Sequence, residues 1–182
     1  MSFPPMALQL AVLLIVTIAA FYDIRYRRIP NAVVLAGLIL GLSLNSFLFE
    51  WQGFLFAAKG FGLALLVYFP LWAIRAMGAG DAKLMAAIGS MLGAANWLGV
   101  FVVTAILGGI AGIVFALARK QLGQRLSNVG FLVSLLLRMQ APYLKSEQLD
   151  VKSEKALRMP HGAIIAAASF VFLAAAWKWA PR

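Results

Sequence analysis

Two aspartates place a carboxylate at the edge of a long apolar segment. Asp23 lies in the segment 21–25 (FYDIR), and Asp81 lies in 78–83 (GAGDAK). A carboxylate at the edge of a membrane span costs free energy unless it is paired or hydrated, so such a residue usually has a function. Two carboxyl groups that are close together in a poorly hydrated site share a proton near neutral pH. One group can then accept a proton while the other donates one, so the two aspartates are candidates for an acid/base pair.

The other four acids have simpler interpretations. Glu147, Asp150 and Glu154 alternate with lysines in a polar segment and indicate a solvated, charged face. Glu50 lies in the short loop 49–52 between apolar runs, where a surface acid is expected. Only Asp23 and Asp81 combine a span edge with a shared side of the membrane.

Each of these two aspartates also has a structural alternative. Asp23 could form a salt bridge with one of the three arginines that follow it, or simply end a helix. Asp81 could be an N-cap, because an aspartate before a helical run accepts hydrogen bonds from free backbone N–H groups. Gly78 and Gly80 favour a functional role, since glycine permits close backbone approach. A cap needs no such room, whereas a carboxylate that meets an extended substrate strand does.

The composition indicates which elements position these residues. The chain has 182 residues, of which 63% are hydrophobic and 12% are charged, and its mean hydropathy is +0.91. A soluble domain is about half apolar and about a quarter charged. The apolar runs approach the ~20 residues that a helix needs to cross a bilayer, and they lack the alternation of a membrane β-barrel. These features predict an all-α, polytopic membrane protein that forms a single integral domain over 1–182.

Six transmembrane helices are expected. Pro30 and Asn31 open the second, because proline is tolerated in the first turn of a helix, and the glycine-rich loop before Asp81 opens the fourth. The first apolar run has no basic region before it and no small-residue cleavage site after it, so we expect a retained span. The predicted spans are 6–22, 30–48, 54–74, 82–95, 97–118 and 161–177.

The distribution of basic residues predicts the orientation. With the amino terminus outside, thirteen of the sixteen lysines and arginines fall on the inner side, which is a strong positive-inside bias. Two spans separate Asp23 from Asp81, so both carboxylates emerge at the cytoplasmic face and both termini lie outside. The net charge of +10 is therefore interpreted as orientation and not as nucleic-acid binding. In the polar segment 119–160, the stretch 129–137 is too short to span comfortably and predicts an amphipathic helix in the cytoplasmic interface.

The residues present also exclude several kinds of site. Cysteine is absent, which rules out disulfides, thiolate zinc sites and cysteine nucleophiles, and His161 is the only histidine. We expect no metal and no organic cofactor.

The segments around Asp23 and Asp81 resemble the motifs of a known family. The motif 78–81 (GAGD) is the Gly-x-Gly-Asp of intramembrane aspartic proteases. Together with 23–31 (DIRYRRIPN) and 80–84 (GDAKL), it resembles the type IV prepilin peptidases, above all the small form from tight-adherence (Flp) pilus systems. Presenilin-type proteases share Gly-x-Gly-Asp and a Tyr-Asp pair, but their aspartates lie on adjacent spans, whereas two spans intervene here.

The resemblance implies an activity and roles for particular residues. Asp23 and Asp81 would be the catalytic pair of a membrane aspartic endopeptidase in the bacterial inner membrane. The substrate would be a prepilin or pseudopilin with a short basic leader that ends in glycine, followed by a hydrophobic helix. Larger members carry a cysteine-bearing insert and also methylate the new amino terminus; the absence of both argues against methyl transfer here. Substrate-binding or site-shaping roles fall to Gly78, Gly80, Lys83, Pro30 and Asn31.

Two further residues leave alternatives open. The segment 159–162 (MPHG) resembles the Pro-x-Gly that opens a late span in this family, so His161 lies either near the site or at an ordinary helix start. Lys83 could stabilise the ionised carboxylate, face an acid in the substrate, or extend to the interface as an orientation-setting charge.

A small proton- or ion-coupled transporter that uses both aspartates as a relay is the alternative function. It would need polar residues deep within the spans. The middles of spans one, two and five contain little beyond Thr17, Ser43 and Thr104.

Overall fold

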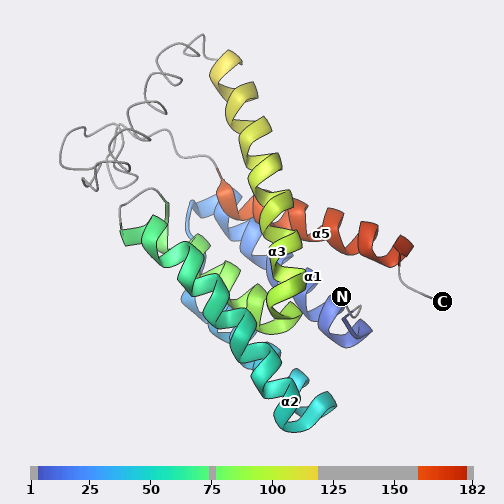
Figure 1. Cartoon of the computed structure of the whole chain (residues 1–182). Coiled ribbons are helices and arrows are strands. Elements are labelled where there is room, and N and C mark those ends of the chain that lie inside the picture. The colour runs from blue at the N-terminus through green and yellow to red at the C-terminus, as the bar shows by residue number, and fades with distance from the viewer. Residues whose placement is uncertain (1–3, 74–76, 119–159, 180–182) are drawn as a thin grey trace.

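The computed structural model describes residues 4–73, 77–118 and 160–179, and in this part of the chain every regular element is a helix (Figure 1). All four helices are long and apolar enough to cross a membrane. The prediction of an all-α membrane protein is therefore confirmed. The amphipathic helix predicted at 129–137 and the rest of the 119–159 segment lie outside the described residues. The helices are α1 (Met6–Tyr26), α2 (Asn31–Ala73), α3 (Ala79–Ala118) and α5 (His161–Trp179).

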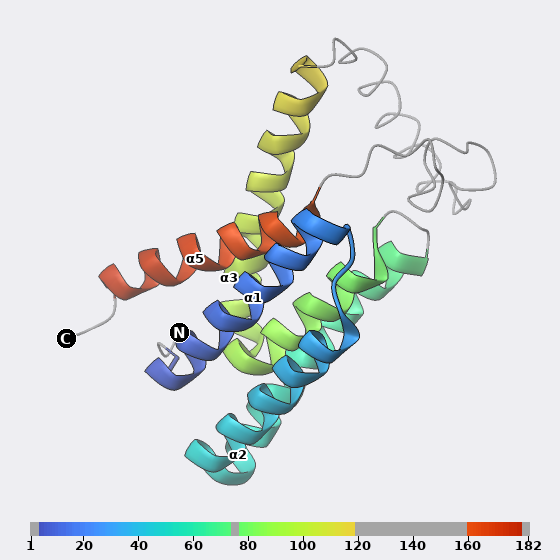
Figure 2. The same cartoon turned by 180° about the vertical axis from the view of Figure 1, so that it is seen from behind.

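Helix α2 reverses direction near its middle. Phe49 and Glu50 have non-helical backbone angles, and Glu50 has a positive φ of 52°. Gly41 in the first half lies against Ser90 of α3, and Gly60 in the second half lies against Gly89. Both halves of α2 therefore pack on the same stretch of α3, and both views show the helix doubling back (Figures 1 and 2).

Helix α3 reverses at Gly93, whose φ of 72° and ψ of 169° lie outside the helical region. The Trp97 indole Nε1 donates a hydrogen bond to the Met85 carbonyl oxygen at 3.0 Å. In a straight helix, residues twelve positions apart would be about 18 Å apart. The second half of α3 therefore folds back beside the first. A residue with a β-carbon disfavours this φ, and the Phe56 ring occupies the space that a β-carbon at Gly93 would need.

The helix boundaries differ from those predicted by a few residues, most notably on α1 and α3. Helix α1 continues to Tyr26, beyond the predicted end at 22, and ends where Arg27 adopts a left-handed conformation with its N–H bonded to the Asp23 carbonyl. Helix α3 begins at Ala79 and turns at Gly93, whereas the predicted spans were 82–95 and 97–118. Hydropathy alone misplaced the ends near Asp23 and Asp81 because polar residues can lie inside a helix when their side chains find partners in the fold.

The first half of α3 forms the centre of the molecule. Its large side chains are almost completely buried, whereas those on the second half are mostly exposed, as expected for a surface that faces lipid. Helix α1 packs against α5 and the first half of α2, as Figure 2 shows from behind. The completely buried large side chains of this central segment are Leu84, Met85, Ile88, Met91 and Leu92.

One buried polar residue was missing from the sequence-based list of polar groups in the spans. Asn45 Nδ2 donates to the carbonyl oxygens of Gly41, Ser90 and Met91 at 2.9, 3.0 and 3.2 Å. These bonds attach the first half of α2 to the end of the first half of α3. Asn45 therefore stabilises helix packing next to the reversal at Gly93.

Candidate active site

Asp23 continues the buried stripe of α1. The side chains on this face recur every three or four residues, so the carboxylate points into the bundle instead of toward the bilayer or water. Asp23 is only 8% exposed, and its Oδ2 accepts a hydrogen bond from the Gly162 backbone N–H at 2.7 Å. That N–H belongs to the first turn of α5, where free backbone donors and the helix dipole favour a negative charge.

Asp81 lies in the first turn of α3 and is half-buried. The residue that precedes this helix is Gly78, whose carbonyl accepts the first helical bond from the Ala82 N–H at 3.3 Å. Asp81 is therefore in the first turn and not at the N-cap position, but its carboxylate still accepts a hydrogen bond from the Gly78 backbone at this helix start, so its capping interpretation is borne out in part. Its Oδ2 would lie 3.0 Å from a β-carbon at Gly78. Glycine at this position leaves room for the carboxylate beside the backbone.

The two carboxyl groups come from different helices and lie close enough to interact electrostatically. Ile29, in the loop between α1 and α2, contributes to this arrangement. Its side chain would lie 3.3 Å from a β-carbon at Gly80 and 3.1 Å from one at Gly162. Ile29 thus packs against the starts of both α3 and α5, and a β-carbon at either glycine would crowd that contact.

Ile29 was not predicted as a site residue. The only available signal was an aliphatic side chain in an otherwise basic loop. In this structure Ile29 fills the space beside Gly80. The missing side chain of Gly80 therefore allows the loop to pack against the start of α3.

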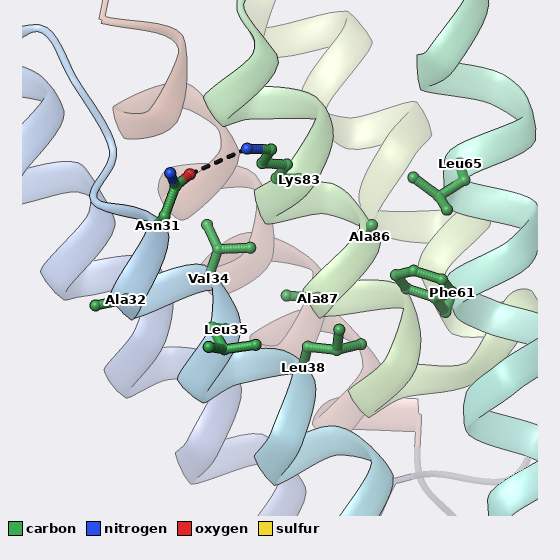
Figure 3. A pocket seen from close by; sticks show the side chains of 10 residues that line it. All are labelled: Asn31, Ala32, Val34, Leu35, Leu38, Phe61, Leu65, Lys83, Ala86 and Ala87. Carbon is green, nitrogen blue, oxygen red and sulfur yellow. Dashed lines mark hydrogen bonds between the residues drawn. The ribbon is translucent and has the colours of Figure 1, made fainter.

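Lys83 and Asn31 form a pair on a different face of α3. Lys83 Nζ donates to Asn31 Oδ1 at 3.1 Å, and both side chains are exposed (Figure 3). Two residues along a helix differ in direction by about 200°, so Lys83 points away from the side occupied by Asp81. Pro30 precedes α2, and its carbonyl accepts the first backbone bond of that helix, from the Val33 N–H at 3.1 Å. The predicted residues thus separate into a carboxylate cluster and a polar pair that joins the starts of α2 and α3.

Two more polar side chains lie close enough to the carboxylates to interact with them electrostatically. Tyr68, on the second half of α2, is 2% exposed, and its ring packs edge-on against Trp97 and Phe101. It interacts electrostatically with Asp81. Nothing in the spacing of the sequence singled out Tyr68, because it lies within an uninterrupted apolar run.

His161 is the first residue of α5 and interacts electrostatically with Asp23. The sequence left open whether it lies near the aspartates or at an ordinary helix start. In the structure both are true: His161 begins α5 and also lies near Asp23. An imidazole beside the bond from Gly162 to Asp23 can hold or move a proton at this end of the site.

Comparison with known proteins gives the family. The sequence model of the type IV leader peptidase family matches residues 10–113, which is more than half of the chain and includes Asp23 and Asp81. The chain belongs to the type IV leader peptidase family. No curated protein and no solved structure gives a significant match. Family membership confirms the resemblance to prepilin peptidases and implies that this membrane protein is a peptidase acting on prepilin-type substrates.

Gly162→Ala is expected to slow peptide cleavage about tenfold to a hundredfold, the loss that follows when a catalytic group is displaced slightly. The added β-carbon would lie 3.0 Å from Asp23 Oδ2 and 3.1 Å from Asp23 Cβ, so the carboxylate must shift. Initial rates of precursor cleavage by purified protein would measure the effect. Gly62→Ala is the control, because its β-carbon meets nothing within 4 Å. Equal rates for both variants would show that the Gly162 contact does not position Asp23.

Proposed function

We propose that this leader peptidase is an aspartic endopeptidase whose catalytic pair is Asp23 and Asp81. The observation that carries the proposal is the electrostatic interaction between two carboxyl groups from separate helices, one bonded to the start of α5 and the other in the first turn of α3. One of them is buried and accepts a backbone N–H, and the other is half-buried. Such a pair shares one proton, because two adjacent charges in a poorly hydrated site repel each other.

The chemistry follows from that shared proton. The ionised carboxylate removes a proton from water, and the resulting hydroxide attacks the scissile carbonyl carbon. The protonated carboxyl group donates a hydrogen bond to the carbonyl oxygen. Collapse of the tetrahedral intermediate breaks the C–N bond, and the leaving amine receives a proton from the pair. The titration belongs to the pair, so neither role is assigned to one aspartate.

The residues around the pair would shape the site. Gly78 makes room for the Asp81 carboxylate, and Gly80 makes room for Ile29. Pro30, Asn31 and Lys83 would hold the beginnings of α2 and α3 in register through the bond between Lys83 and Asn31. The mechanism needs no metal and no organic cofactor. We assign the whole chain, 1–182, to one integral membrane peptidase domain.

The site is proposed to face the cytoplasm, and the chain to cross the inner membrane six times with both termini outside. The reversals in α2 and α3 support this topology, because each divides a helix about twice as long as a membrane span into two antiparallel segments. The excess of basic residues on one side supports the orientation.

Reporter fusions test that topology. Fusions after Arg28 and after Lys83 are expected to report the cytoplasm, and a fusion within 49–53 is expected to report the outside. The reason is that the first half of α2 must cross once between residue 31 and the reversal at Glu50. Alkaline phosphatase and green fluorescent protein give complementary signals for the two sides. Opposite locations for Arg28 and Lys83 would contradict the shared face on which the catalytic pair depends.

The proposed substrate is a prepilin or pseudopilin of the Flp type with a short basic leader that ends in glycine before a hydrophobic helix. The face around the site is itself basic, so bulk charge does not attract such a leader. The substrate helix would instead be placed by packing against the bundle within the bilayer. Co-expression with a candidate Flp-type prepilin tests the proposal by the shift from precursor to mature size on a gel. An unchanged precursor with correctly inserted peptidase would contradict it for that substrate.

A further inference from the structure

A groove of about 410 Å³ lies between the two halves of α2 (Figure 3). Its walls are apolar side chains from both halves, among them Leu38, Phe61 and Leu65, and its floor includes Ala86 and Ala87 of α3. This volume is in the range of about 300–1,000 Å³ that small-molecule sites occupy.

The polar groups of this groove are gathered at one end. Lys83 and Asn31 line that end, joined by their 3.1 Å hydrogen bond. A lysine ammonium group has three donor hydrogens, and the bond to Asn31 uses one. The other hydrogens can bond to a further acceptor, and the positive charge favours one that carries negative charge. Lysine is a common ligand of phosphate groups.

The occupant must therefore be apolar along most of its length and anionic at one end. We propose that the groove binds a phospholipid of net negative charge, with an acyl chain between the halves of α2 and the head-group phosphate on Lys83. The groove is open on one side and is not an enclosed cavity. Anionic lipids are also attracted to basic residues at the membrane surface.

The position of the groove argues against the peptide substrate as its occupant. Asp81 and Lys83 differ in direction by about 200° around α3, so the groove lies on the side of this helix away from the carboxylate pair. A bound lipid instead contacts the starts of α2 and α3 together, where Asn31 and Lys83 already join them.

Native mass spectrometry of the purified full-length protein, titrated with phosphatidylglycerol or phosphatidylcholine, tests the proposal. We expect one tightly retained phosphatidylglycerol and weaker retention of phosphatidylcholine. Lys83→Gln should weaken phosphatidylglycerol binding about fivefold, the effect of one basic residue at an anionic surface. Lys83→Arg should retain binding. Lys59→Gln, which removes the same charge from an exposed position of α2 outside the groove, should bind as the wild type does.

A second pair of variants tests the acyl-chain part of the groove. Val34→Phe fills the groove and should weaken lipid binding, whereas Val102→Phe, on the exposed face of α3, should not. Equal binding by wild type, Lys83→Gln and Val34→Phe would overturn the proposal. Displacement of the lipid by inorganic phosphate alone, or by a prepilin helix, would overturn it too, in favour of a simple anion site or a substrate groove. Each of these readouts is independent of peptidase activity.

Discussion

Asp23→Asn and Asp81→Asn are each expected to abolish precursor processing while the protein remains folded in the membrane. Acid/base catalysis by a positioned group contributes about 10²–10⁴-fold, and an amide cannot exchange the shared proton. Asparagine has nearly the same shape as aspartate, and its Oδ1 can still accept the Gly162 N–H that holds residue 23. The fold is therefore expected to survive the loss of the charge.

Cleavage of a co-expressed prepilin, followed by gel mobility, measures both variants, and membrane fractionation checks their insertion. Glu50→Gln is the matched control, because Glu50 is an acid at the reversal of α2, remote in topology from the carboxylate pair. It should process normally. Substantial activity in either Asn variant would contradict the two-carboxylate mechanism, even if the wild-type protein cleaves the substrate.

Gly60→Ala is expected to destabilise the helix bundle strongly. A β-carbon at this position would overlap the Gly89 carbonyl oxygen and lie 2.8 Å from the Gly93 Cα. These are backbone atoms, so no side-chain rotation can relieve the clash, and the second half of α2 must move away from α3. Overpacking of this kind typically costs about 1–3 kcal/mol.

The thermal midpoint in detergent, followed by size-exclusion chromatography after heating, measures this effect. Gly62→Ala lies two residues away on the same helix and meets nothing within 4 Å. Because alanine favours a helix by up to about 1 kcal/mol over glycine, that control should melt at the same temperature or higher. Equal midpoints for the two variants would show that the close contact between α2 and α3 is not required for stability.

The fold class and the family could be predicted from the sequence because they depend on local patterns. Apolar runs separated by short polar loops predict membrane helices, and the two short motifs around Asp23 and Asp81 carry the family resemblance. The helix ends were less predictable. Asp23 is inside α1 because its carboxylate finds a donor on α5, which is a tertiary contact. The reversal at Glu50 uses a positive φ in a residue with a side chain, so no glycine marks it.

The surroundings of the site could be predicted only in part, because they depend on tertiary contacts between residues that are far apart in the sequence. Counting spans predicts two helix crossings between the aspartates, and hence that both lie on one face of the membrane. By contrast, Ile29 contacts the starts of α3 and α5 through residues 51 and 133 positions away. Tyr68 interacts electrostatically with Asp81 only because α2 doubles back. The roles of Asp23 and Asp81 in catalysis remain predictions.

The first half of α3 has a further consequence for the surrounding bilayer. From Ala79 to the break at Gly93 it has fourteen residues, or about 21 Å of helix. A typical hydrocarbon core is about 30 Å thick. In the six-crossing topology, the lipids beside this segment must thin or the helix ends must sink below the surface, which is hydrophobic mismatch. Thinning at this point would bring the head-group region and its water down to the level of Asp81. Membrane thickness would then help to set how readily water enters the site.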